Sequence, residues 1–283
     1  MNWPQVFPRF HLSQLKWRPL PLSARGFILR GFPLHKITLS SRSPKVDLFR
    51  YAICQAYFVD EITEALAHRR ESILEPYLSE SWRADFWHDS PVILDFPVAG
   101  DAHLMVRGLY RPEDVLWIGG QFDSGKPQHE ANFRTTTEWI ELETLPPRIA
   151  SGTFKQGSIS RSDSNLISSP FIVIESDDLI GHKPDDDVER EWNKRLCAAL
   201  ILLCRDRLKL SLRAVIDTGG KSLHGWFDRP SPDAVEALMS IAQGLAIDDA
   251  VVTRASNPLR LPGCIHQKTS KPARLLYLNA KTF

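Results

Sequence analysis

The chain has 283 residues, of which 43% are hydrophobic and 10% aromatic. That is enough apolar material for one large domain or two closely packed ones, and it excludes a disordered or fibrous chain. The formal net charge is +1, but residues 1–50 are strongly basic and residues 51–100 run acidic. The basic stretch is either an arm that lies along phosphates or the solvated face of a core, and the pattern leaves both alternatives open.

The four cysteines show neither a CxxC pair nor a zinc-ligand spacing; they are Cys54, Cys197, Cys204 and Cys264. Core packing is the favoured role for Cys197 and Cys204, seven residues apart in an expected helix. We identify no signal peptide and no apolar run long enough to cross a membrane. The default expectation is therefore a reducing, cytoplasmic location with no membrane partner.

The first half of the chain predicts an extended, proline-rich arm over residues 1–45, followed by helical structure over residues 46–88. Short apolar segments predict three strands, at residues 91–96, at 115–118 and around 139–142. Glycine-rich and serine-rich stretches predict loops at residues 119–127 and 157–165.

The last 115 residues or so predict an alternation of strands and helices in the order β-α-β-β-α-β. The expected elements are a strand at 171–175, a helix at 188–207, strands at 212–216 and 222–227, a helix at 232–245 and a strand at 274–278. This order is typical of the ferredoxin-like or RRM-like unit. In that unit the first and third strands lie side by side in the middle of the sheet. Both helices cover one face, so the other face carries a site or meets another lobe.

Polar residues at the ends of two of these strands point to chemistry. Side chains alternate along a strand, so Glu175 and Asp177 share a face, as do Ser222 and His224 on the third strand. If these strands are neighbours, two carboxylates and an imidazole converge. Carboxylate oxygens are hard ligands that suit Mg²⁺ or Mn²⁺. Each residue alone is weak evidence, because strand-end acids are usually solvated and a lone histidine is usually packed.

Further candidates lie downstream of the second helix. Asp248 or Asp249 could complete the acidic set, and Arg260 stands in an apolar run, where an arginine needs an anionic partner. That partner is either a triphosphate or a nearby carboxylate. Trp117, Phe122 and Trp139 could stack exposed bases, although core packing is the favoured role for each.

The order of these segments resembles the archaeo-eukaryotic primase superfamily, in the form found in phages, plasmids and other mobile elements. The segments are Phe171–Asp177 (FIVIESD), Lys221–His224 (KSLH), Ala246–Asp248 (AID) and Leu259–Gly263 (LRLPG). The resemblance extends over about residues 105 to 280. It implies an α+β primase-polymerase core in which an N-terminal α/β lobe packs on an RRM-like lobe.

The resemblance also implies roles for individual residues and a reaction. Glu175, Asp177 and Asp248 would bind Mg²⁺ or Mn²⁺, and four residues would contact the incoming NTP or dNTP: Lys221, Ser222, His224 and Arg260. The enzyme would be a nucleotidyltransferase that extends chains on a single-stranded DNA template during DNA replication. By this reading residues 1–89 are an arm and helical region of unknown role, 90–170 the N-terminal lobe and 171–283 the catalytic lobe.

The sequence departs from the family pattern in three ways. Glu175 stands where many members have aspartate. The doublets Asp177-Asp178 and Asp248-Asp249 leave the ligand register open, because a slip of one residue changes the face. No phosphate-binding loop of a helicase is present, so the chain is a stand-alone core, a truncation, or works with a separate replicative helicase.

Three rival functions remain. An RRM-like sheet can bind single-stranded nucleic acid without chemistry, but the aromatic RNA-binding signature is absent. A rolling-circle nicking nuclease needs a His-x-His metal pair, and here His224 is followed two residues later by Trp226. A degenerate replisome subunit would not be expected to keep all three acidic segments.

Overall fold

The computed structural model describes residues 64–94, 98–120 and 130–283, all of which belong to one compact unit. The expected basic arm, Cys54, Phe122 and most of the loop at 119–127 lie outside the described residues. Mixed helices and antiparallel sheets make this unit an α+β structure. No helix in the described part of the chain is both long enough and apolar enough to span a bilayer.

The described N-terminal segment is helical, as expected, but it is interrupted. Residues 64–74 form a helix that runs into the 3₁₀ turn η2 (Glu75–Tyr77), and α2 (Trp82–Asp89) follows after a break. Pro76 lies in η2, and because it has no N–H and clashes with the preceding turn, it ends the first helix. Leu74, Trp82 and Phe86 are buried and anchor both helices in the core.

The first sheet has the strand order β2-β1-β3-β9, with antiparallel neighbours throughout. Its strands are β1 (Val115–Gly119), β2 (Phe133–Thr135), β3 (Arg148–Ala150) and β9 (Pro258–Arg260). The expected strand at 115–118 is confirmed as β1. The chain crosses the proposed domain boundary at residue 170 to build this sheet, because β9 pairs with β3.

Two of the strands predicted for this region are wrong. Residues 91–94 are bends and coil with one backbone hydrogen bond, from Val92 to Leu278, and Ile93 is 86% exposed. The segment around Trp139 is instead a short helix, α4 (Thr136–Ile140). Its N-terminus carries a capping box in which Thr135 and Glu138 satisfy each other's backbone N–H groups. This local capping prevails over the β propensity of tryptophan and isoleucine.

The second sheet contains the four strands predicted from the C-terminal half, in the order β10-β7-β8-β6. They are β6 (Phe171–Ile174), β7 (Leu212–Asp217), β8 (Leu223–Asp228) and β10 (Arg274–Leu278). The two predicted helices are also present, as α5 (Asp187–Asp206) and α6 (Pro232–Ala242). Ser231 caps α6 by accepting from Ala234 N–H, as the sequence indicates.

The strand order corrects one expectation. A ferredoxin-like sheet would place β6 in the middle, beside β10, but here β6 lies at the edge and β10 pairs with β7. The short turn fixes β7 against β8 as a hairpin. Either neighbour would give β10 an antiparallel partner, so the pattern of elements cannot choose between the two orders. The expected contact of the first and third strands, β6 with β8, is present.

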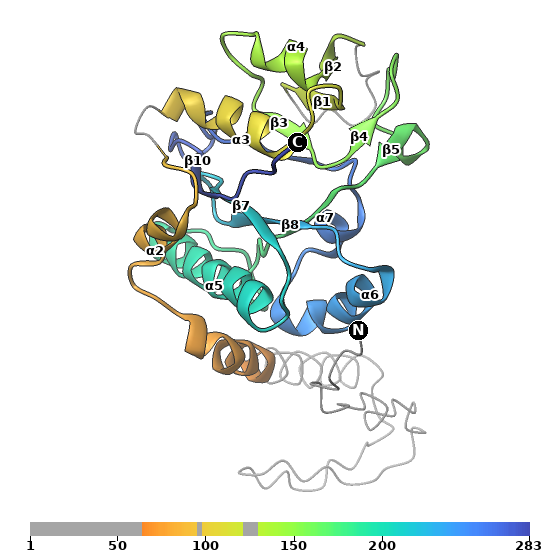
Figure 1. Cartoon of the computed structure of the whole chain (residues 1–283). Helices are drawn as coiled ribbons and strands as arrows, with labels where there is room; N and C mark the ends of the chain where they lie inside the picture. The colour runs from red at the N-terminus through yellow and green to blue at the C-terminus, as the bar shows by residue number, and fades with distance from the viewer. Residues whose placement is uncertain (1–63, 95–97, 121–129) are drawn as a thin grey trace, which may run out of the picture. The chain divides into compact units, whose positions relative to one another are not determined.

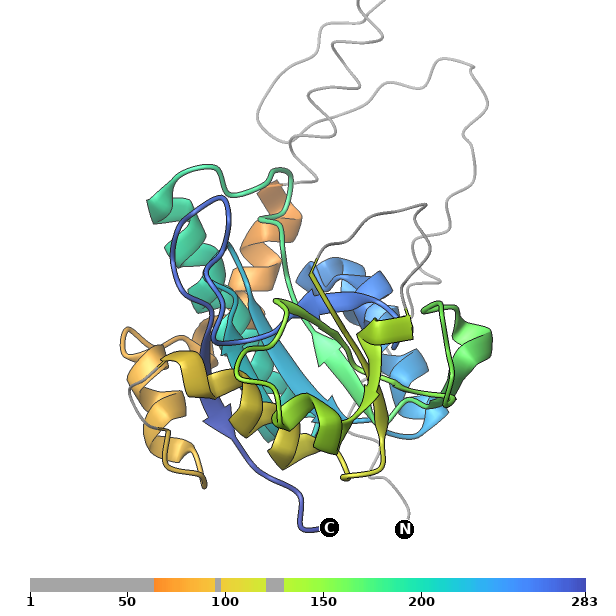
Figure 2. The same ribbon diagram turned by 90° about the horizontal axis from the view of Figure 1, so that it is seen from above.

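The two faces of the second sheet pack against different layers (Figures 1 and 2). Helices α5 and α6 cover one face, with Ile174 and Phe227 from the sheet in their core. The other face meets α3 (Asp101–Leu109) and the first sheet, and here Val173 and Trp226 are fully buried. The face that the sequence left either to carry a site or to meet another lobe is therefore packed against α3 and the first sheet.

Short elements complete the described chain. They are η3 (Val98–Gly100), η4 (Glu130–Asn132), η5 (Asp163–Asn165), η6 (Gln243–Leu245), α7 (Asp249–Thr253) and the small β4–β5 pair (Thr153–Phe154 and Leu166–Ser168). The expected loop at 157–165 is confirmed apart from η5. Trp117 and Trp139 are core residues, 0% and 2% exposed, and so are Cys197 and Cys204.

Candidate active site

The carboxylate of Glu175 follows β6 and is held by two side chains of the neighbouring β8 segment. Ser222 Oγ donates to Glu175 Oε1 at 2.8 Å, and His224 Nε2 lies 3.1 Å from Glu175 Oε2. Strand alternation places Glu175 and His224 on the same face as Val173 and Trp226, the face that meets the first sheet. The structure thus brings together three side chains that the sequence placed on one sheet face.

Asp177 lines the same cavity as Glu175, whereas Asp178 does not. Lys221 Nζ contacts both aspartates, Asp177 Oδ2 at 3.1 Å and Asp178 Oδ1 at 3.2 Å. Of the two possible registers left open by the doublet, the geometry favours Asp177 as the residue that acts with Glu175.

The two cavity carboxylates have pKa values displaced in opposite directions. Burial disfavours the charge of Glu175, but the neighbouring His224 and the hydrogen bonds to Glu175 outweigh burial and lower its pKa to about 2. Burial, followed by the charge of Glu175, raises the pKa of Asp177. Burial also opposes the charge of Lys221, but Asp177 and Asp178 outweigh it and raise the pKa of that amine. The carboxylates of Glu175 and Asp177 thus lie in the same cavity, and the charge of Lys221 partly stabilises the ionised form of Asp177.

The turn between β7 and β8 brings its backbone close to the loop at residues 266–271. Gly219 has φ +69°, and a Cβ there would lie 2.7 Å from the carbonyl oxygen of Lys271. Thr269 Oγ1 donates to the Gly219 carbonyl at 2.6 Å and ties the two loops together. Only glycine meets both requirements at residue 219, and the tight turn is what delivers Lys221 and Ser222 to the cavity.

The opposite wall of the cavity is cationic. Arg148 on β3 and Arg260 on β9 are directly paired across the two strands, and both line the cavity with His266. Burial, then their mutual charge, lowers the pKa of Arg260, and burial lowers that of Arg148. Among the described residues, no carboxylate pairs with either guanidinium. Two adjacent half-buried arginines that pair with no carboxylate in the described part of the chain are suited to bind an anion.

Neutral histidine is favoured at the same wall. Burial, followed by the charges of Arg260 and Arg148, lowers the pKa of His266. Arg161 also belongs to this side of the molecule, because burial and then the charge of Arg148 lower its pKa, and its guanidinium stacks 4.3 Å over Trp117. The cavity therefore has an acidic wall and a basic wall.

Asp248 is near Glu175, but its carboxylate has a different partner. Its backbone N–H donates to the Glu175 carbonyl at 2.9 Å, while Asp248 Oδ1 accepts from Ala250 N–H and caps α7. Asp248 does not line the cavity, and no cluster of three or more metal-ligating side chains occurs among the described residues. The structure brings together two of the three predicted acidic residues.

The two acids that converge fit a divalent cation. Their side chains interact directly, since a hydrogen bond between them affects the pKa of both and the charge of Glu175 also raises the pKa of Asp177. Like charges held together in a cavity are relieved by a cation, and carboxylate oxygens suit Mg²⁺ and Mn²⁺. Glu175 and Asp177 are thus the residues able to hold such an ion.

The cavity between the two walls has a volume of about 410 Å³. It is lined by Arg148, Glu175, Asp177, Thr218, Gly220, Lys221, Ser222, His224, Val251, Asn257, Pro258, Leu259, Arg260 and His266. All four residues predicted to contact substrate are in this set, together with two of the three predicted metal ligands. His224 Nδ1 is buried and has no hydrogen-bond partner in the described part of the chain.

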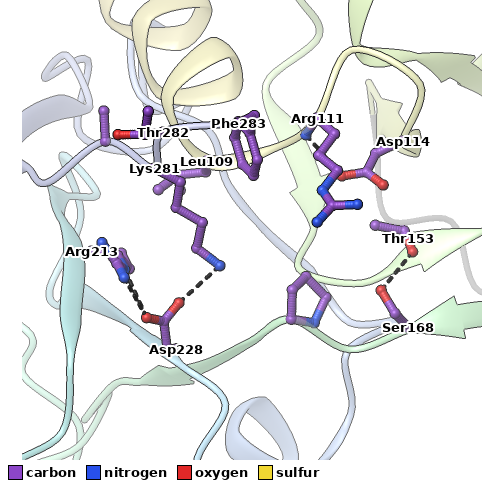
Figure 3. Close-up of a pocket in the computed structure, with 12 residues that line it drawn as sticks. Leu109, Arg111, Asp114, Thr153, Ser168, Arg213, Asp228, Lys281, Thr282 and Phe283 are labelled. Atoms are coloured by element: carbon purple, nitrogen blue, oxygen red, sulfur yellow. Dashed lines mark hydrogen bonds and ion pairs between the residues drawn. The ribbon is translucent and has the colours of Figure 1, made fainter.

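A larger cavity, of about 760 Å³, lies at the other end of β7 and β8 (Figure 3). None of the predicted site residues lines it. Its central carboxylate, Asp228, pairs with Arg213 at 2.7 Å and with Lys281 at 2.8 Å. Thr153 and Ser168 bond to each other through their hydroxyls at 2.8 Å. In this larger cavity, the Asp228 cavity, the central carboxylate is thus already paired with two cations of the chain.

Sequence reasoning missed Arg148. It lies in a three-residue strand after Pro146 and Pro147, and nothing local marks it as part of a site. The sequence contains one signal for Arg148, which is an arginine next to residues that are buried in a short strand. The same kind of signal identifies Arg260. His266 is a second cavity residue that the sequence analysis did not single out, and its place in the cavity follows from the loop that contacts Gly219.

No known family profile matches the sequence, and no curated protein is similar to it. Among solved structures, the archaeo-eukaryotic primase domain of the cyanophage S-2L primase-polymerase aligns with 64% of this chain and 89% of its own length. The two share 19% sequence identity and superpose with a TM-score of 0.37.

Proposed function

We propose that this chain is a primase-polymerase that catalyses metal-dependent nucleotidyl transfer to a 3′-hydroxyl on a single-stranded nucleic-acid template. The observation that carries the proposal is the two-walled cavity. Glu175 and Asp177 form one wall, and Arg148 and Arg260, which pair with no carboxylate among the described residues, form the other. A metal–triphosphate complex presents this combination of charges, a cation beside an extended polyanion. The order of motifs described above agrees with the same assignment.

The chain's own residues would divide the work between substrate binding and orientation. Arg148 and Arg260 would bind the triphosphate through charge-assisted hydrogen bonds. When its ring carries both protons, His224 would donate from Nδ1 to a phosphate oxygen while Nε2 remains on Glu175. Each such contact is worth about 2–4 kcal/mol of transition-state stabilisation if it is well placed.

Glu175 and Asp177 would hold the divalent ion, Mg²⁺ or Mn²⁺. The ion would lower the pKa of the attacking 3′-hydroxyl and offset charge on the triphosphate. Lys221, between Asp177 and Asp178, would keep the acidic loop in place before the substrate arrives.

The binding-module alternative is weakened by the packing of the second sheet. A non-catalytic RRM-like module stacks bases on the open face of its sheet, but here that face is buried under α3 and the first sheet. Trp226, the aromatic residue of β8 on this face, is fully buried.

The decisive assay supplies a single-stranded template, Mg²⁺ or Mn²⁺, and labelled NTPs or dNTPs, with and without a primer. We expect the wild-type chain to extend the primer and His224→Ala to have lost extension while keeping its fold. Wild-type activity in His224→Ala would contradict the site assignment. Absence of any product from the wild-type chain under all of these conditions would contradict the proposed function.

The third predicted ligand has its own test. Asp248→Asn keeps the cap on α7, because asparagine caps as well as aspartate, but it removes the carboxylate charge. If Asp248 moves onto the ion during the reaction, the variant loses extension without losing stability. Full activity would restrict the metal ligands to Glu175 and Asp177.

A further inference from the structure

Ser176 stands between the two cavity carboxylates in the chain and is completely buried. It carries Glu175 on one side and Asp177 on the other, so the position of its backbone sets where both carboxylates start. Ser176 lies beyond the last hydrogen-bonded residue of β6. The sheet ladder therefore does not fix it, and other contacts must.

Arg70, on the helix formed by residues 64–74, makes contacts that fix the position of Ser176. Its Nη2 donates to Ser176 Oγ at 2.9 Å and its Nη1 to the Asp178 carbonyl at 3.3 Å. Ser176 Oγ in turn donates to the same Asp178 carbonyl at 3.3 Å. The planar guanidinium thus holds both ends of the three-residue segment from Ser176 to Asp178.

Asn193 of α5 ties this acidic segment to the turn that carries the substrate-contacting residues. Its Nδ2 donates to the Ser176 carbonyl at 2.8 Å and to the Lys221 carbonyl at 2.9 Å. One side chain therefore sets the spacing between the Glu175–Asp177 segment and the Lys221–Ser222 segment.

The position of Arg70 is costly, which argues that the contacts matter. The residue is 2% exposed, and no carboxylate in the described chain forms an ion pair with it. Its partners are one hydroxyl and one carbonyl. A buried charge without an ion-pair partner usually destabilises a fold relative to an apolar residue of similar size. A methionine would fill the same space without the desolvation penalty of a buried charge, but it could not donate hydrogen bonds to Ser176 and Asp178.

We propose that Arg70 and Asn193 are positioning residues for the Glu175 and Asp177 carboxylates, an inference whose catalytic consequence rests on the proposed function. The helix at residues 64–74, which the sequence leaves without a role, thereby becomes part of the catalytic apparatus. Arg70 acts through Ser176 and does not itself touch substrate or metal.

Amide hydrogen exchange tests the positioning directly, whatever reaction the chain catalyses. We expect Arg70→Met to speed exchange at residues 175–178 by about 10-fold or more, while β7 and α5 stay protected. The matched control is Arg107→Met, the same substitution at an exposed position of α3. Exchange at residues 175–178 equal in the two folded variants would overturn the proposal.

Ser176→Ala provides a second, milder variant that removes the same hydrogen bond from the other side. Because both variants remove the Arg70–Ser176 hydrogen bond, their effects on exchange should be less than additive in the double variant. Fully additive effects would show that this shared bond contributes nothing, and would also overturn the proposal. Arg70→Lys should restore part of the protection, since one ammonium can reach Ser176 but cannot also span to Asp178 as a fork.

Activity and Mn²⁺ titration then separate the two proposals. Arg70→Met should weaken Mn²⁺ binding by about 10–100-fold, the range for partners that orient metal ligands, and should lower kcat more than it raises KM. If the wild-type chain extends primers and Arg70→Met has faster exchange but an unchanged kcat, the positioning role fails and the proposed function stands. If the wild-type chain extends nothing, the proposed function fails, and the exchange data still decide the positioning.

Discussion

The two cavities at opposite ends of β7 and β8 contain similar side chains but differ in how their charges are satisfied. In the Asp228 cavity, one carboxylate is shared by Arg213 and Lys281, so each of these two cations has a carboxylate partner within the chain (Figure 3). In the candidate active site, Arg148 and Arg260 face each other across two strands, and no carboxylate in the described ranges pairs with either. Cavity size alone would select the Asp228 cavity, which is the larger of the two.

What distinguishes the two is how the cations in each are paired with carboxylates. A cation paired with a carboxylate contributes to folding and has little left to offer a ligand. A cation held near another cation is a cost to the folded state, and this cost is recovered only when an anion binds. The comparison predicts that substitutions should lower activity in one cavity and stability in the other.

The largest expected effect separates two neighbouring aspartates. Asp177→Asn should lower the rate of primer extension by about 10³-fold, since a lost ligand charge removes several kcal/mol of transition-state stabilisation. Asp178→Asn is the matched control, because Asp178 also contacts Lys221 but does not line the cavity. It should keep extension within a few-fold of wild type. The reverse result would move the metal site by one residue.

The next prediction concerns two variants that should bind the nucleotide less tightly without becoming less stable. Arg148→Met or Arg260→Met should raise KM for the nucleotide by about 10–100-fold, the loss of one charge-assisted hydrogen bond of about 1.5–3 kcal/mol. The same variants should unfold at an equal or higher temperature, because each removes a like-charge pair across two strands. Steady-state kinetics and thermal unfolding measure the two effects. A lower unfolding temperature would mark the arginines as structural.

Local patterns in the sequence indicated most of this site. The run Phe171–Ile174 reads as a buried strand, and alternation from it places Glu175 and Asp177 on one face. The glycine pair before Lys221 indicates the tight turn that delivers Ser222 and His224. These inferences succeed because each depends on a few adjacent residues and on the two-residue period of a strand.

The features that the sequence did not predict have a different cause. They depend either on which of two local structures forms or on which distant segments pair. Arg148 joins the site only because β3 pairs with β9, a contact far apart in the chain that no local pattern encodes. The same limit applies to β10, whose two candidate neighbours satisfy the pattern equally well. The strand predicted around Trp139 is wrong because a helix begins there. The Thr135–Glu138 capping box is a local signal in the sequence for that helix start.

Asp248 illustrates a third limit. Its place after a helix and before the apolar segment at residues 250–252 also fits an N-cap, and the structure shows its carboxylate in that role. One short segment can therefore serve as a helix cap or as a metal ligand, and its residue types do not distinguish the two.

In the Asp228 cavity, Asp228→Asn should lower the unfolding free energy at neutral pH by about 1–2 kcal/mol, between the values for exposed and buried pairs. Primer extension per folded molecule should be unchanged. Burial disfavours the charge of Asp228, but Arg213 and Lys281 outweigh burial and lower its pKa. The stabilisation is therefore fully present above the ordinary aspartate pKa, and it is lost as the pH falls through the lower, folded-state value.

Thermal unfolding of wild type and Asp228→Asn across this range checks the sign. The difference between them should be largest near neutral pH and should shrink below about pH 4, the ordinary aspartate value. A difference that grew in acid would mean that the carboxyl is stabilised in its protonated form, contrary to the pairing in Figure 3.

The smallest effect concerns Lys281, which pairs with Asp228 and also lies 4.3 Å from the ring centre of Phe171. Lys281→Met keeps the packing of the side-chain stem and should cost about 0.5 kcal/mol in unfolding free energy. The cost should vanish in an Asp228→Asn background if the ion pair is responsible, and should persist there if the contact with Phe171 is responsible. Extension activity should match wild type in both backgrounds. A clear loss of activity would show that the Asp228 cavity also binds a substrate. The two cavities would then no longer divide into one that stabilises the fold and one that binds the nucleotide.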